Sequence, residues 1–126
     1  MTSRFIAQPA GAEAYALGEG PVWDPDRDRL LWVDILGGVV HAGRLSPERI
    51  TVTETWKFDD LACAVAVSAA GELLVAERGG VLRVKTDGTR TPVADLRKAG
   101  SRLNDGAVDP QGRFVVGGMA LHDARG

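Results

Sequence analysis

The sequence contains few of the residues that carry cross-linking or reactive chemistry. It has one cysteine, Cys63, and two histidines in 126 residues. A single cysteine excludes an internal disulfide and suits a reducing compartment. No apolar run approaches the roughly 20 residues of a membrane-spanning helix, and the first residues lack a signal-peptide core. With a net charge of -2, nothing favours nucleic acid or an anionic membrane as a partner. We therefore expect a cytoplasmic protein.

Most short catalytic motifs are also absent. The chain has no phosphate-binding glycine-rich loop with its lysine, no nucleophile elbow and no paired-histidine zinc helix. The acidic run Asp24-Pro25-Asp26-Arg27-Asp28 resembles the opening of a calcium loop, but Arg29 stands where that loop needs glycine and Ile35 where it needs glutamate. We interpret this run as a solvated hairpin turn. His41 and His122 are isolated, which favours surface or core positions over catalysis.

What the sequence does contain is many turn residues between short apolar segments. Glycine contributes 16 residues and proline 6, which favours many short strands. A continuous or alternating apolar pattern with β-branched residues predicts a strand. Such segments are expected at residues 22–23, 30–35, 39–42, 50–58, 63–67, 73–77, 81–84, 89–94, 107–109 and 113–118.

These strand segments recur at a nearly fixed spacing. Leu30 corresponds to Leu73, 43 residues later, and Leu73 to Phe114, 41 residues later. Gly37–His41 matches Gly79–Arg83 with an offset of 42. Multi-stranded repeats of about 40–50 residues are typical of a β-propeller. The alternative is an irregular β-sandwich whose spacing is coincidental.

The predicted fold class is therefore all-β, as part of a β-propeller. Residues 1–126 form one domain with repeats at about 18–60, 61–100 and 101–126, the last of them incomplete. Propellers close with about 4–8 blades, and this length holds at most three. We expect the chain to be the N-terminal portion of a longer propeller, and to be poorly stable or to associate if it exists alone, because an open wedge leaves strand edges uncovered.

Glu19 is the leading candidate for a metal ligand. It lies between Gly18 and Gly20, with Pro21 next, so the backbone there turns sharply or approaches a neighbour closely. Hard cations such as Ca²⁺ prefer carboxylate and amide oxygens. The alternative is that Glu19 is a solvated loop residue.

A second candidate site is the segment Ser101–Gly106. Arg102 offers a planar fork of donors and Asn104 offers a donor and an acceptor, which together suit an oxygen-rich ligand such as a sugar. Two residues apart on an extended segment, they would point the same way. The alternative is that Asn104-Asp105-Gly106 simply forms a turn.

Together these stretches resemble the gluconolactonase/regucalcin family. The resemblance is carried by Gly18-Glu19-Gly20-Pro21-Val22-Trp23, by Leu31–Ile35, and most specifically by the block Arg102–Phe114 with Gly118-Met119-Ala120 after it. It covers nearly the whole chain. It implies a six-bladed propeller, of which this chain holds the first two to three blades.

The resemblance also implies a site. The family binds one divalent metal, Ca²⁺ or Zn²⁺ and possibly Mn²⁺ or Mg²⁺, and Glu19 would be one ligand. Arg102 and Asn104 would bind the sugar. The remaining ligands, an Asn and a catalytic Asp, are expected beyond the chain end, so the catalytic residues are unknown here. Regucalcin-like members have an acidic pair after Met119-Ala120, where this chain has Leu121-His122.

The expected function is hydrolysis of a sugar lactone by a metal-dependent enzyme, which opens an aldonolactone to the aldonic acid. Two alternatives remain at this point. One is a calcium- or ligand-binding propeller without turnover, and the other is an inactive truncated remnant.

Overall fold

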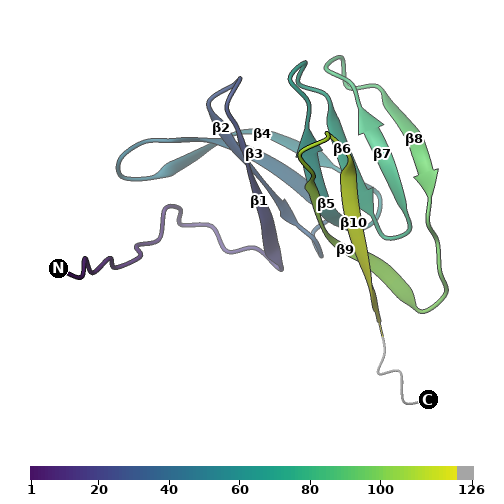
Figure 1. Ribbon diagram of the computed structural model, residues 1–126, viewed down its shortest axis with the longest axis horizontal. Coiled ribbons are helices and arrows are strands. Elements are labelled where there is room, and N and C mark those ends of the chain that lie inside the picture. The colour runs from purple at the N-terminus through teal and green to yellow at the C-terminus, as the bar shows by residue number, and fades with distance from the viewer. Residues whose placement is uncertain (122–126) are drawn as a thin grey trace.

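The computed structural model describes residues 1–121, and in them the chain forms ten strands and no helix (Figure 1). No helix in this part of the chain could therefore cross a membrane. The strands are β1 (Gly18–Asp24), β2 (Arg29–Asp34), β3 (Val39–Leu45), β4 (Ile50–Lys57), β5 (Ala62–Val67), β6 (Leu73–Glu77), β7 (Gly80–Val84), β8 (Arg90–Asp95), β9 (Ser101–Val108) and β10 (Phe114–Ala120).

The strands form three antiparallel sheets in chain order. β1–β4 and β5–β8 each form a four-stranded sheet of sequential neighbours, and β9 pairs with β10. The sheets fan out from one another, and β5 contacts both β1 and β9 (Figure 1). The first strand of each sheet therefore faces the first strand of the next. This confirms the all-β prediction and is the arrangement of propeller blades.

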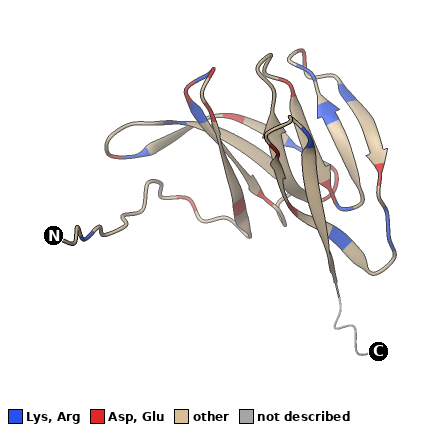
Figure 2. Cartoon of the chain, viewed as in Figure 1, with Lys and Arg blue, Asp and Glu red and all other residues tan. Residues whose placement is uncertain are grey.

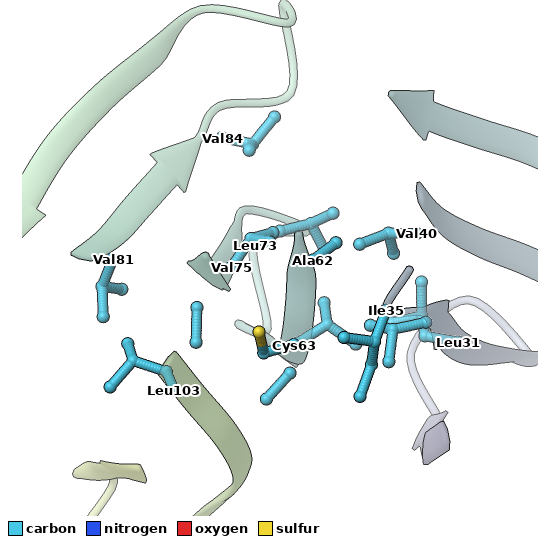
Figure 3. Packing of buried hydrophobic residues seen from close by; sticks show 14 of the residues in the cluster. Leu31, Ile35, Val40, Ala62, Cys63, Leu73, Val75, Val81, Val84 and Leu103 are labelled. Carbon is cyan, nitrogen blue, oxygen red and sulfur yellow. The ribbon is translucent and has the colours of Figure 1, made fainter. Parts of the chain in front are cut away.

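The core lies where neighbouring sheets pack. Leu31 and Val33 of β2, Val65 of β5 and Val75 of β6 are almost completely buried. Figure 3 shows this cluster, with Leu31 and Val75 among the labelled residues. Strand β5 reads Ala-Cys-Ala-Val-Ala-Val and is buried along nearly its whole length, because sheets lie on both of its sides. The outermost strands β4 and β8 are mostly exposed.

Equivalent turns of the three sheets share one unusual backbone conformation. Asp28, Gly71 and Gly112 follow the first strand of their sheets, and their φ angles are 49°, 89° and 82°. They are spaced by the same 43 and 41 residues as the apolar repeat. A positive φ favours glycine, so Asp28 is the exception among the three.

The interpretation of the acidic run as a solvated turn is wrong for its first residue. Asp24 is 1% exposed and accepts hydrogen bonds from Arg29 Nε at 2.9 Å and Arg27 Nη1 at 3.3 Å. Arg29, itself buried, also binds Glu54 at 2.9 Å and lies over the Trp56 ring. Asp24 is the carboxylate that makes burial of the Arg29 charge possible.

Arg27 also connects the first sheet to the second. Its Nη2 donates to the carbonyl of Ala69 at 2.8 Å, in the turn between β5 and β6. A Cβ at Gly71 would lie 2.7 Å from the Arg27 guanidinium, so glycine gives the arginine room to reach that turn.

Replacing Asp24 by alanine should lower the free energy of unfolding by about 3–5 kcal/mol, since it leaves the Arg29 charge buried with one partner fewer. Asp26→Ala, at an exposed position of the same turn, should change it by less than about 0.5 kcal/mol. Urea denaturation followed by tryptophan fluorescence measures both values. Equal effects of the two substitutions would contradict a structural role for Asp24.

Candidate functional site

A groove of about 660 Å³ lies between the first strands of the three sheets. It is lined by residues 19–26 of β1 and its turn, 65–69 of β5 and its turn, and 105–108 of β9. The groove is thus bordered by the first strand of each of the three sheets. In the described residues, basic and acidic positions are distributed over the sheets and their turns (Figure 2).

Each of these first strands carries a β-bulge near its beginning. The pairing register shifts between Glu19 and Val22 in β1, between Ala62 and Ala64 in β5, and between Leu103 and Gly106 in β9. Bulges bend a strand and redirect side chains, and they are frequent beside active sites. Both candidate segments, around Glu19 and around Asn104, therefore lie at equivalent irregular positions of their sheets.

Glu19 lies on β1 opposite Val33, is exposed, and lines the groove. Gly20 follows with a φ of 57°, which confirms that the backbone bends sharply there. The segment leading to Glu19 is fixed by Asp34, whose carboxylate accepts from the backbone N–H groups of Leu17 at 2.9 Å and Ala16 at 3.3 Å. Glu19 is thus an exposed carboxylate on an anchored backbone.

Asp34 has a pKa below its ordinary value. Burial alone would raise the pKa of this carboxyl, but the N–H groups of Leu17, Gly37 and Ala16 together outweigh that effect. Gly37 N lies 3.2 Å from the carboxylate, so one side chain joins the entry to β1 with the turn after β2. The ionised form of Asp34 is therefore the one that the fold stabilises.

Arg102 and Asn104 lie on β9, so the alternative reading of Asn104-Asp105-Gly106 as a turn is wrong. β9 begins at Ser101, six residues earlier than the strand expected at 107–109. Arg102 Nη1 donates to Asn104 Oδ1 at 3.2 Å and to the Leu103 carbonyl at 3.0 Å. The two side chains therefore lie together on one side of β9, and the buried Leu103 lies between them in sequence.

Cys63 contacts Arg102 from the neighbouring sheet. Its Sγ lies 4.0 Å from Arg102 Nη1, and the thiol is buried among the core side chains (Figure 3). Burial raises the pKa of the Cys63 thiol, and the Arg102 charge opposes that rise. Nothing in the sequence indicated this contact, because 39 residues separate the two positions.

The structure brings the predicted site residues together only in part. Arg102 and Asn104 touch each other, whereas the groove wall that includes Glu19 contains Asp105 of β9 and neither of them. Within residues 1–121, no three histidine, cysteine, aspartate or glutamate side chains are grouped to hold a metal ion. Glu19 suits a hard cation in type, but the described residues do not form a metal centre by themselves. His122 lies outside the described residues.

The family model described as SMP-30/Gluconolactonase/LRE-like region matches residues 17–126. The chain belongs to this family. Its sequence is 40% identical over 114 residues to pentonolactonase XacC of Haloferax volcanii, covering 87% of this chain and 37% of that protein. It is 34% identical over 113 residues to regucalcin of Gallus gallus, covering 87% of this chain and 37% of that protein.

A solved structure is similar as well. The calcium-binding protein regucalcin from Agrobacterium tumefaciens superposes with a TM-score of 0.70 at 32% identity, over 84% of this chain and 36% of that one. The chain thus spans little more than a third of the length of the family members that it matches, which are six-bladed propellers.

Acid should destabilise the protein in part through Asp34. Because the folded pKa is lowered, the stability that the carboxylate contributes is complete above the ordinary value of 3.8 and is lost as pH falls below it. We expect the difference in free energy of unfolding between wild type and Asp34→Asn to be constant above about pH 5 and to shrink below 3.8. Urea denaturation at a series of pH values measures it.

The exposed carboxylate Asp26 provides a control, because Asp26→Asn should reproduce the pH profile of the wild type. A difference between wild type and Asp34→Asn that stays constant down to pH 2.5 would contradict the assigned role.

Proposed function

We propose that this chain forms the first blades of a metal-dependent sugar-lactone hydrolase, which opens an aldonolactone to the aldonic acid. The observation that carries the proposal is the hydrogen-bonded pair of Arg102 and Asn104 at the bulge of β9, within a chain of the gluconolactonase family. The name of its pentonolactonase relative supports this reaction class. The free Cys63 fits our proposal of a cytoplasmic location.

The described residues would hold and orient the substrate. A sugar lactone is a neutral molecule with hydroxyl groups, so it needs directed donors and acceptors. Within residues 1–121, Arg102 forms hydrogen bonds through Nη1 alone, so Nε and Nη2 can donate to a ligand, and Asn104 contributes its amide group. Two groups fixed on one strand would bring the ester carbonyl to a defined position.

Hydrolysis of the ester further requires a group that polarises the carbonyl and a base that activates water. A divalent ion, Ca²⁺ or Zn²⁺ and possibly Mn²⁺ or Mg²⁺, would supply the first when bound. Glu19 would be one of its ligands, since it is an exposed carboxylate at the groove on a fixed backbone. We expect the other ligands and the catalytic Asp beyond residue 126.

One alternative has specific support. The Agrobacterium relative is described as a calcium-binding protein, so a propeller that binds Ca²⁺ without turning over a lactone is the second candidate. Both functions require the metal, so its removal does not separate them. The measurement that separates them is turnover of a lactone.

The complete protein that contains this chain should hydrolyse D-glucono-1,5-lactone, and a chelator should abolish the activity. Glu19→Gln should weaken metal binding at least tenfold, since it replaces a charged ligand by a neutral one. A pH-indicator assay and isothermal titration with Ca²⁺ and Zn²⁺ measure these effects. Metal binding without turnover would favour the binding protein. Unchanged metal affinity in Glu19→Gln would show that Glu19 is not a metal ligand.

Arg102→Ala should weaken substrate binding while the metal stays bound. Loss of hydrogen bonds from a charged donor costs about 1.5–3 kcal/mol, which corresponds to a rise in KM of about ten- to hundredfold. Arg44→Ala, at an exposed position of β3, is the matched control and should leave KM unchanged. Loss of the metal in Arg102→Ala would show that the role assigned to Arg102 is wrong.

A further inference from the structure

The beginning of β1, which carries Glu19, is paired with β2 over a very short distance. Only two residue pairs precede the bulge, Gly18 with Asp34 and Glu19 with Val33. Residues 1–17 form no strand before them, and after them the register shifts and Gly20 adopts a φ of 57°. Two pairs between irregular segments do not fix the direction of a strand by themselves. The direction of Glu19 must therefore be set by additional contacts.

The end of β2 supplies these contacts. Asp34 Oδ1 accepts a hydrogen bond from Leu17 N at 2.9 Å, and Asp34 Oδ2 accepts one from Ala16 N at 3.3 Å. The next residue, Ile35, donates its N–H to the Leu17 carbonyl at 2.9 Å. Leu17 is thus held through both of its backbone polar groups. Only Gly18 separates it from Glu19, so a displacement of Leu17 would also displace Glu19.

The Asp34 carboxylate is itself held in place. The residue is 9% exposed, and Gly37 N donates to Oδ1 at 3.2 Å. A Cβ at Gly37 would lie 2.5 Å from Oδ2, closer than side chains approach one another. Gly37 does not have a positive φ, so the carboxylate, and not the backbone conformation, is what requires glycine there.

We propose that Asp34 is a positioning residue for Glu19, and that it holds the Glu19 carboxylate in the direction in which it binds a divalent metal ion. This inference rests on the proposed function, in which Glu19 is one metal ligand. Asp34 does not line the groove, so it acts through the backbone of residues 16–18. A ligand that is already in place costs less to order when the ion binds, and residues that orient ligands therefore contribute to metal affinity.

The test is isothermal titration of the complete protein with Ca²⁺ and Zn²⁺. Asp34→Asn should weaken metal binding about tenfold. An amide has only one acceptor oxygen, so asparagine cannot accept from both sides as the carboxylate does. In a Glu19→Gln protein, the same substitution should change the affinity by less than about twofold, because the side chain that Asp34 positions no longer binds as a charged ligand.

Two further variants separate positioning from charge and from stability. Gly37→Ala keeps the Asp34 charge but displaces the carboxylate, and it should also weaken metal binding several-fold. Val75→Ala creates a cavity at a fully buried position of β6 that does not line the groove, and it should leave the metal affinity unchanged. Thermal melting without metal verifies that each variant is folded at the temperature of the titration.

The outcomes distinguish this inference from the proposed function. If the wild type binds neither ion, both fail. If Glu19→Gln weakens binding and Asp34→Asn does not, the metal site stands and the role of Asp34 is wrong. If the ions bind as expected but no lactone is hydrolysed, the proposed enzyme fails and the role of Asp34 stands.

Three results would overturn the positioning role even if Asp34→Asn weakens binding. Equal losses with and without Glu19→Gln would show that Asp34 acts independently of Glu19. An unchanged affinity in Gly37→Ala would attribute the loss to the missing charge. A similar loss in Val75→Ala would attribute it to general destabilisation.

Discussion

The packing of sheet against sheet is the constraint on which the rest of this structure depends. Each sheet has an apolar face that a neighbouring sheet must cover, and β5 is buried because it lies between two such neighbours. Strand β5 therefore has no room for polar chemistry. The candidate side chains Glu19 and Asn104 lie instead on β1 and β9, beside the bulges of those strands. Fold and site are thus two consequences of one arrangement.

The repeat could be predicted from the sequence because a blade is a local unit. Each sheet consists of strands that follow one another in the chain, so the spacing of apolar segments reports the pairing directly. The prediction failed where the partner was distant. Asp24 looked like a turn residue, but it is buried and paired with Arg29, which also binds Glu54, 25 residues further along the chain from Arg29. Local turn propensity does not contain that information.

In the candidate site, too, local features could be predicted from the sequence and contacts between distant residues could not. That Arg102 and Asn104 share one side follows from the alternation of side chains along a strand, and the hydrogen bond between them agrees with it. The composition of Asn-Asp-Gly equally favoured a turn, and the pairing of β9 with β10 decides against it. Cys63 was missed because it reaches this place from the neighbouring sheet. Side chains that meet between blades leave no periodic signal in a single sequence.

The contact of Arg27 with the turn of the second sheet makes the repeats unequal. Arg27 reaches Ala69 because Gly71 has no side chain, and the residue equivalent to Gly71 in the first repeat is Asp28. A protein built by duplicating the first repeat would place a Cβ where the guanidinium now lies, and the arginine would have to leave. The blades share one architecture but are not interchangeable modules. The order of repeats along the chain is thus encoded in the side chains of single turns.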